Sequence, residues 1–326
     1  MADRLVSQKR SSDSPPKPPW VRVRLPSGET YAQLRQLIRG KHLHTVCEAA
    51  LCPNIAECWG RGTATFMILG DVCTRNCRFC AVRHGVPVNT GERSGEPLQV
   101  ARAVAAMGLR HAVVTSVTRD DLPDGGAKVF AETISWLRQL NPTGAIEVLT
   151  PDFGGNWEAL RTVVVAAPDI FGHNMETVPR LYPAARPEAL YQRSLQALER
   201  AHVLNPSCPT KSGLMLGMGE SQEEILAVMC DLRRVGCDIL TLGQYLRPTR
   251  AHLPVARYYT PEEFAALAEA GRRMGFAHVE SGPLVRSSYH ADAQARDSRR
   301  GAGEVAARPD ISCTPVGEDT PPANKP

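Results

Sequence analysis

Short apolar runs alternate with amphipathic stretches along most of this 326-residue chain. Six of the runs are short and are followed by polar residues, a pattern typical of buried parallel strands. They are Thr65–Leu69, Ala112–Val117, Ile146–Thr150, Asp169–Gly172, Ser212–Leu216 and Asp238–Leu242. The stretches between them have helical spacing and clear start signals, such as the capping boxes that begin at Ser221 and Thr260. This alternation predicts a parallel sheet with right-handed crossovers.

Six such units within residues 63–285 favour an α/β fold of the partial (β/α)6 barrel type over a closed eightfold barrel. An open doubly wound sheet is the alternative, and periodicity alone does not separate the two. In either fold the chemistry gathers at the carboxyl ends of the strands. The segments that follow the strands are polar: Asp71–Cys73, Thr115–Asp121, His173–Glu176, Gly217–Glu220 and Gly243–Tyr245. Within the second of them, we interpret Arg119, Asp120 and Asp121 as a solvated charge run.

The chain divides into four segments. Residues 1–19 are polar and Pro-rich and are predicted to be disordered, residues 20–62 form an N-terminal extension, and residues 63–285 form the barrel. Residues 286–326 form a C-terminal segment whose tail lacks periodicity and is also predicted to be disordered.

Composition narrows the class of protein. The chain is 43% hydrophobic and 22% charged, as in ordinary globular proteins, and its net charge of +4 is too small to favour a nucleic-acid-binding protein. No apolar run approaches the roughly 18–20 residues that span a bilayer, and the first ten residues lack the apolar core of a secretory signal. We therefore expect a cytoplasmic protein with no nucleic-acid or membrane partner.

Cysteine is the informative residue, because six of the ten cysteines lie within residues 47–80. Such clustering in a reducing compartment indicates metal or redox chemistry. Cys73, Cys77 and Cys80 have C-x3-C-x2-C spacing directly after the first strand. Three thiolates can hold three irons of a four-iron cluster and leave the fourth iron open to a small molecule. A zinc site completed by His84 is the alternative.

A second set of three cysteines precedes the first. Cys47, Cys52 and Cys58 have C-x4-C-x5-C spacing and again supply three ligands. Buried cysteines that only pack in a helix are the alternative. Together the two sets predict two four-iron clusters per chain.

The C-x3-C-x2-C set on a β/α framework resembles the radical S-adenosylmethionine superfamily. The longer patterns C-E-A-A-L-C-P-N-I-A-E-C-W (47–59) and G-D-V-C-T-R-N-C-R-F-C (70–80) resemble the lipoyl synthase family. Five further segments agree with that family: 115–126, 171–180, 209–215, 240–246 and R-S-S-Y-H at 286–290. The resemblance covers about residues 20–292. The tail after residue 292, which contains Cys313, matches nothing in the pattern.

The resemblance implies a sulfurtransferase that inserts two sulfur atoms into a protein-bound octanoyl-lysine. S-adenosylmethionine provides 5′-deoxyadenosyl radicals in that family, and an auxiliary four-iron cluster provides the sulfur. Cys73, Cys77 and Cys80 then hold the radical cluster, and Cys47, Cys52, Cys58 and a serine of the R-S-S-Y motif hold the auxiliary cluster. Neighbouring residues of an extended segment point in different directions, so only one serine is expected to reach the iron. The resemblance selects Ser288 over Ser287.

Five other residues are candidate contacts to S-adenosylmethionine. Phe79 matches the aromatic residue that lies near the adenine in such enzymes, and a core aromatic is its alternative role. Asn174 and Glu176 follow the fourth predicted strand, where they can hold a ribose or an amino group. Thr115 and Ser116 end the second predicted strand and can contact the methionine part, or only satisfy backbone groups at the sheet end.

The resemblance also implies partners. They are octanoylated carrier domains (the E2 subunits of 2-oxoacid dehydrogenases and the glycine cleavage H protein), an electron donor such as ferredoxin or flavodoxin, and a cluster repair or assembly protein. The basic residues of the extension, which could steer an acidic carrier domain or simply be solvated, are Arg22, Arg24, Arg35, Arg39 and Lys41. Another sulfur-inserting radical enzyme, similar to biotin synthase, and a non-catalytic iron–sulfur or zinc protein are the alternative functions.

Overall fold

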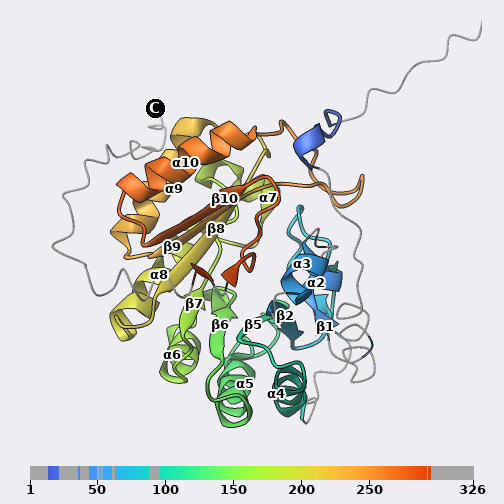
Figure 1. The fold of residues 1–326 in the computed structure, drawn as a ribbon, viewed down its shortest axis with the longest axis vertical. Helices are drawn as coiled ribbons and strands as arrows, with labels where there is room; N and C mark the ends of the chain where they lie inside the picture. Colours follow the sequence, from blue (N-terminus) through green and yellow to red (C-terminus); the bar gives the residue numbers. More distant parts are fainter. Residues whose placement is uncertain are drawn as a thin grey trace, which may run out of the picture.

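The computed structural model describes residues 14–21, 36, 44–49, 52, 54–60, 63–87, 95–291 and 293–294. Its main feature is an eight-stranded sheet in the order β1-β2-β5-β6-β7-β8-β9-β10 (Figure 1). The strands are β1 (His44–Thr45), β2 (Thr63–Ile68), β5 (His111–Ser116), β6 (Ala145–Leu149), β7 (Ile170–Gly172), β8 (Thr210–Leu216), β9 (Ile239–Gln244) and β10 (His278–Gly282). Strands β2 to β10 pair in parallel, and β1 pairs antiparallel with β2.

The strand order decides between the two folds that the sequence allows. Neighbouring strands follow one another along the chain, whereas a doubly wound sheet reverses its order at a switch point. Among the described residues no pairing joins the first strand of the sheet to the last. The predicted partial barrel is therefore confirmed.

The larger helices connect the parallel strands and lie along one face of the curved sheet (Figure 1). They are α4 (Glu96–Ala106), α5 (Ala127–Leu140), α6 (Trp157–Val165), α8 (Tyr191–Leu204), α9 (Gln222–Arg234) and α10 (Pro261–Arg273). The shorter elements are α2 (Val46–Ala49), α3 (Ile55–Gly60), α7 (Tyr182–Ala185), the 3-10 turns η1 (Pro19–Val21), η2 (Phe153–Gly155) and η3 (Pro179–Leu181), and a two-stranded ribbon of β3 (Val72–Cys73) and β4 (Arg83–His84). Helices α2 and α3 of the N-terminal extension pack on β2.

Local sequence explains these elements well. All six predicted strands are present, with ends within two residues of those expected, and both capping boxes form at Ser221 and Thr260. Strands β1 and β10 were not predicted. Strand β10 has the sequence H-V-E-S-G, which lacks an apolar run, and only its parallel pairing with β9 makes it a strand.

A buried triad of Lys211, Glu147 and His111 lies at the amino end of the barrel. The ammonium of Lys211 on β8 is 2.6 Å from one carboxylate oxygen of Glu147 on β6, and His111 on β5 is 3.1 Å from the other. Lys211 lies on the same side of its strand as Met215, which faces the cavity at the opposite end. The triad therefore fills the barrel below that cavity, and the other end remains for chemistry.

The described part of the N-terminus packs on the loop that follows β9. The hydroxyl of Ser14 accepts a hydrogen bond from the Val255 amide at 3.0 Å, and the indole of Trp20 donates one to the Tyr259 carbonyl at 3.1 Å. Residues 14–19, which we expected to be disordered, thus have a defined course. The rest of both predicted disordered tails lies outside the described residues, as do Cys313 and the basic residues of the extension listed above. None of the helices described here is long and apolar enough to cross a membrane.

Candidate active site

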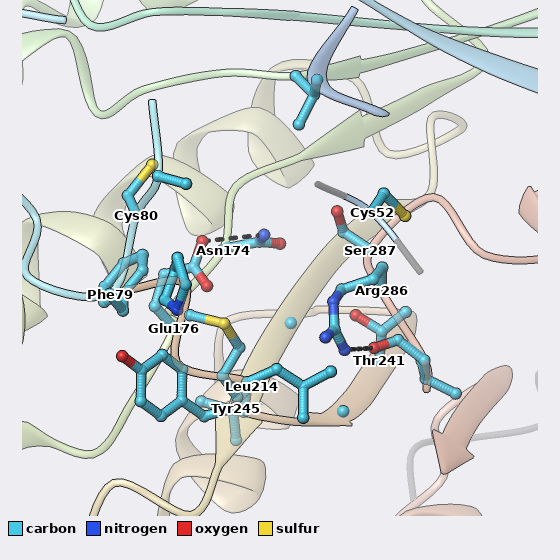
Figure 2. Close-up of a pocket in the computed structure, with 18 of the residues that line it drawn as sticks. Cys52, Phe79, Cys80, Asn174, Glu176, Leu214, Thr241, Tyr245, Arg286 and Ser287 are labelled. Atoms are coloured by element: carbon cyan, nitrogen blue, oxygen red, sulfur yellow. Dashed lines mark hydrogen bonds between the residues drawn. The ribbon is translucent and has the colours of Figure 1, made fainter. Parts of the chain in front are cut away.

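Two adjoining cavities, of about 450 Å³ and about 290 Å³, lie at the carboxyl ends of the strands. The residues they share include Cys52, Phe79, Cys80, Asn174, Glu176, Arg286 and Ser287. Figure 2 shows these side chains around one space, contributed by the extension, the loop after β2, the loop after β7 and the segment after β10. The predicted edge of the sheet is therefore where the candidate residues meet.

The first set of cysteines lines the smaller cavity in full: Cys73, Cys77 and Cys80. The Thr118 amide donates a hydrogen bond to the Cys73 sulfur at 3.3 Å, and the Cys80 amide bonds to the Cys77 carbonyl. Burial raises the pKa of Cys77 to about 12 and that of Cys80 to about 11. Thiols in such surroundings ionise when a metal takes the charge, as ligands of iron do.

An ionic network holds the loop that carries these cysteines. Arg75, which is 6% exposed, contacts both carboxylate oxygens of Asp120 at 2.7 and 2.9 Å, and it also contacts Asp152 at 2.6 Å. Arg193 of α8 binds the other oxygen of Asp152 at 2.7 Å. The loop after β2 is thus tied to the loops after β5 and β6.

This network corrects one expectation. We interpreted Arg119, Asp120 and Asp121 as a solvated charge run, but Arg119 is 5% exposed and forms two 2.8 Å bonds to Asp121. Asp120 instead holds Arg75. Each of the three charges therefore has a partner of opposite sign. The partner of Asp120, Arg75, is distant in the sequence, so local charge alone does not predict it.

The second set of cysteines comes close to the first. Cys47 of α2 and Cys52 line the smaller cavity, whereas Cys58 of α3 is not part of its lining. Burial and the neighbouring Cys52 raise the pKa of Cys47 to about 11, and hydrogen bonds from Thr65 lower it. The hydroxyl proton of Thr65 itself is donated to the Ser288 hydroxyl at 2.9 Å. Thr65 of β2 therefore connects Cys47 to the predicted serine ligand.

Both serines of the motif reach the cavity wall. Ser288 lines the smaller cavity, and Ser287 lines both cavities. The contact with Thr65 holds Ser288 in the wall of the smaller cavity, which Cys47 also lines, and its role as a ligand stays a prediction.

The donor set fits four-iron clusters. In the described part of the chain, no group of three or more His, Cys, Asp or Glu side chains converges on a single ion position. Zinc needs its ligands within about 2.3 Å of one centre, whereas the thiolates of a four-iron cluster bind different irons. His84, the proposed fourth zinc ligand, is exposed and lines neither cavity.

The predicted cofactor contacts also line the cavities. The Asn174 amide donates to Glu176 at 3.1 Å, while its own oxygen is buried without a partner among the described residues. Glu176 has a left-handed backbone (φ +68°), and such strain gathers at functional sites. Burial raises the pKa of the Glu176 carboxyl. These two side chains therefore offer unused acceptors to a ligand.

The other three candidate contacts to S-adenosylmethionine, Ser116, Thr115 and Phe79, differ in their surroundings. The Ser116 hydroxyl is buried without a partner among the residues described, whereas the Thr115 hydroxyl donates to the Leu149 carbonyl at 2.8 Å. Thr115 thus satisfies a backbone group, as in its alternative role. Phe79 lies beside Cys80 and lines both cavities.

Sequence reasoning missed two arginines of the site. Arg186 donates to the Asn174 and Met175 carbonyls at 2.9 and 3.0 Å, and its Nε is buried without a partner in the described structure. Arg286 faces the cavities, where burial lowers its pKa and the nearby Cys52 and Glu176 oppose that shift. Arg286 lies in the R-S-S-Y-H segment, which could have indicated it. No local pattern marks Arg186.

The comparisons with known proteins agree with this site. A family model for the radical SAM superfamily matches residues 67–232, which makes the chain a radical S-adenosylmethionine enzyme. The solved structure of the FeFe-hydrogenase maturase HydG from Carboxydothermus hydrogenoformans shares the fold, with a TM-score of 0.56 and 16% identity over 82% of this chain and 68% of that one.

The particular family follows from closer relatives. A second family model, for the N-terminal domain of lipoyl synthase, matches residues 2–52. The lipoyl synthase of Rubrobacter xylanophilus is 60% identical over 286 residues, 88% of each chain. That of Symbiobacterium thermophilum is 55% identical over 305 residues, 93% of this chain and 95% of the relative. The chain belongs to the lipoyl synthase family: it is a sulfur-inserting enzyme that uses S-adenosylmethionine and four-iron clusters and acts on lipoyl carrier proteins.

Proposed function

We propose that the two cysteine sets divide the work of lipoyl formation across one cavity. Cys73, Cys77 and Cys80 hold the cluster that binds S-adenosylmethionine. Cys47, Cys52, Cys58 and Ser288 hold the auxiliary cluster. When bound, these cofactors supply the 5′-deoxyadenosyl radical that removes hydrogen from the octanoyl chain and the sulfur that replaces it. The supporting observation is the 290 Å³ cavity, which is lined by five of these six cysteines and by Ser288.

The protein supplies position and exclusion of water. Asn174, Glu176 and Ser116 offer hydrogen-bonding groups to S-adenosylmethionine, with Phe79 against its adenine, whereas the Thr115 hydroxyl is already bonded to the Leu149 carbonyl and only lines the cavity. The larger cavity suits an octanoyl chain, because its lining includes the apolar residues Leu149, Leu214, Met215, Leu246 and Val285. Enclosing the chain in this cavity, next to both cysteine sets, would keep a reactive carbon radical away from solvent and other side chains.

The partners follow from the same chemistry. The octanoyl group arrives on a carrier domain of an E2 subunit or of the glycine cleavage H protein. Cleavage of S-adenosylmethionine needs an electron from a donor of the ferredoxin or flavodoxin type. Because the sulfur comes from the enzyme itself, a cluster repair protein is needed between turnovers. Thiolate ligands require reducing surroundings such as the cytoplasm.

An anaerobic assay with an octanoyl-lysyl peptide tests this division. The purified enzyme, supplied with S-adenosylmethionine and dithionite, should yield lipoyl peptide by mass spectrometry. The triple change of Cys73, Cys77 and Cys80 to Ala should leave one cluster and stop cofactor cleavage. The triple change of Cys47, Cys52 and Cys58 to Ala should leave cleavage intact and remove the product. Identical behaviour of the two triple variants would contradict the proposal.

A further inference from the structure

The ligands assigned to the auxiliary cluster come from opposite ends of the chain. The cysteines belong to the extension, and Ser288 belongs to the segment after β10. A direct link joins the two parts beside the ligands themselves. On one side it begins at Glu57, the residue before Cys58 in α3, and on the other at Tyr289 and His290, the residues after Ser288.

One carboxylate receives both side chains. The Tyr289 hydroxyl lies 3.1 and 3.2 Å from the two carboxylate oxygens of Glu57, and the His290 Nε2 lies 3.1 Å from one of them. The rings of Tyr289 and His290 stack with their centroids 3.8 Å apart and an angle of 26° between their planes. The two rings therefore reach Glu57 as one unit.

The link continues into the sheet. The other ring nitrogen of His290 is 3.5 Å from Glu280 of β10, and Glu280 is 3.3 Å from His278 of the same strand. Strand β10 pairs with β9 along its whole length, so Glu280 is a fixed point. His290 thus joins the extension, through Glu57, to the barrel.

Two further contacts hold the same segment. The Asn54 amide donates to the Leu284 carbonyl at 2.5 Å, and the Thr65 hydroxyl donates to Ser288 at 2.9 Å. Residues 284–290 are therefore held at their beginning, at the serine and at their end. The contact at the end comes from Glu57, which adjoins Cys58 in the chain, and the contact at the beginning comes from Asn54, whose carbonyl accepts the Cys58 amide at 3.0 Å.

Other roles for this group fit less well. The Glu57, Glu280, His278 and His290 side chains do not form a site for a single metal ion, since the described residues contain no such group. An exposed ion pair contributes little to stability in general. His290 nevertheless has a left-handed backbone (φ +54°), which persists only where surrounding contacts fix it.

We propose that Glu57 is a positioning residue for the auxiliary cluster, which keeps the segment that carries Ser288 in register with Cys58. The inference rests on the ligand assignment made above. A serine oxygen is a harder donor than thiolate and suits iron–sulfur clusters less well. Its occupancy of the iron therefore depends on how closely the chain holds it there, as for any ligand tethered near its site. Glu57 supplies that tether without touching the iron.

The test uses the full chain with Cys73, Cys77 and Cys80 changed to Ala, so that only the auxiliary cluster remains. Anaerobic transfer of iron to a chelator is followed by absorbance. Glu57→Ala should speed iron loss about tenfold or more, as loss of an outer-shell contact does at other metal sites. Glu57→Gln, which keeps an acceptor oxygen for Tyr289, should restore most of the retention. Glu269→Ala, which removes an exposed carboxylate paired with Arg272 on α10, is the matched control and should change nothing.

A double-mutant cycle identifies the contact. Tyr289→Phe should speed iron loss less than Glu57→Ala does, and the double variant should be no worse than Glu57→Ala alone, because both changes break one link. In the enzyme with both cysteine sets, Glu57→Ala should lose lipoyl product yet cleave S-adenosylmethionine as the parent does. In the cluster-free Glu57→Ala variant, the amide hydrogens of residues 284–291 should exchange faster than those of the cluster-free parent.

The outcomes separate the two proposals. The background variant keeps Glu57 and lacks only Cys73, Cys77 and Cys80. If it holds no cluster, the assignment of the auxiliary-cluster ligands is itself wrong. If that background holds a cluster but Glu57→Ala and Tyr289→Phe lose iron at the background rate, the positioning role is wrong. Equal loss of auxiliary-cluster iron and of S-adenosylmethionine cleavage in Glu57→Ala would also overturn it, because a tether acts on one cluster only.

Discussion

Thr65 and Ser288 are 223 positions apart in the chain, and the Thr65 hydroxyl donates a 2.9 Å hydrogen bond to the Ser288 hydroxyl. Thr65 belongs to the first barrel strand and also contacts Cys47 of the extension. One residue of β2 therefore lies between Cys47 and Ser288, the thiol and the hydroxyl that we propose as ligands from opposite ends of the sequence. The neighbouring Ser287 has no such contact among the interactions of the described residues, and it lines the larger cavity as well.

The two serines should therefore differ in function. We expect Ser288→Ala to keep S-adenosylmethionine cleavage but to lose lipoyl product, because the auxiliary cluster lacks its oxygen ligand. Ser287→Ala should retain product. The measurement is 5′-deoxyadenosine and lipoyl peptide from the same anaerobic reaction, together with iron content. The reverse pattern, with product lost only in Ser287→Ala, would assign the ligand to the other serine.

The Arg75 network should act on the radical cluster alone. Lysine at position 75 keeps the charge but cannot bind Asp120 with two nitrogens while reaching Asp152. We expect Arg75→Lys and Asp120→Asn each to slow S-adenosylmethionine cleavage about 10–100-fold, the range of outer-shell changes at metal sites. The auxiliary cluster should remain, which iron analysis in each variant can check. Arg272→Lys, on the exposed face of α10, is the control. Equal loss of iron from both sites would indicate general unfolding.

Much of the fold could be predicted because its signals are local. Six of the seven parallel strands of the large sheet are apolar runs, and helices α9 and α10 begin with side chains that cap their own backbone. Strand β10 could not be found in this way, since its residues are partly polar and its partner β9 defines it. The two cysteine sets were visible because metal ligands at close spacing are rare by chance.

The site beyond the cysteines depends on contacts between distant residues. Arg75 meets Asp120 and Asp152 from 45 and 77 positions away, so local charge suggested solvent where the structure has a buried network. Arg186 enters the cavity from the turn after α7, and nothing in its local sequence sets it apart. The place of the closely spaced cysteines at the cavity could thus be predicted from the sequence, whereas the residues that surround and position them could not.

His173 should make stability depend on pH. It is fully buried, with its ring nitrogens 2.9 Å from the Thr150 carbonyl and 3.0 Å from the Ser194 hydroxyl. Burial first, and then the charge of Arg186, lowers its pKa from 6.5 to about 4. Below pH 6.5 the His173 imidazole therefore binds a proton in the unfolded chain, whereas in the folded chain it binds one only below about pH 4. The free energy of unfolding should fall through this window by at most about 3 kcal/mol from this group.

The asparagine variant isolates this effect. His173→Asn keeps a donor toward Thr150 but cannot titrate, so its free energy of unfolding should fall less between pH 7 and pH 4.5 than that of the parent. Urea unfolding of the cluster-free chain measures both. Asp152 does not confuse the comparison: its arginine partners hold its pKa below the ordinary 3.8, so its contribution is present above that pH and is lost only at lower pH. Parallel pH curves for parent and variant would contradict the role of His173.

Binding of S-adenosylmethionine should depend on the pair Asn174 and Glu176. The Asn174 amide orients the Glu176 carboxylate at 3.1 Å, and its own buried oxygen has no partner in the described structure, so both residues present acceptors to the donors of a ribose or an amino group. We expect Asn174→Ala to weaken binding about tenfold, which corresponds to about 1.4 kcal/mol. Glu176→Ala should weaken binding further, because it leaves the donors of the bound ligand without their carboxylate acceptor.

Equilibrium binding to the cluster-loaded enzyme without reductant measures the dissociation constant separately from turnover. Thr115→Val, which removes a hydroxyl already bonded to the Leu149 carbonyl, should leave the constant nearly unchanged. A larger effect from Thr115→Val than from Asn174→Ala would move the binding site from the loop after β7 to the end of β5.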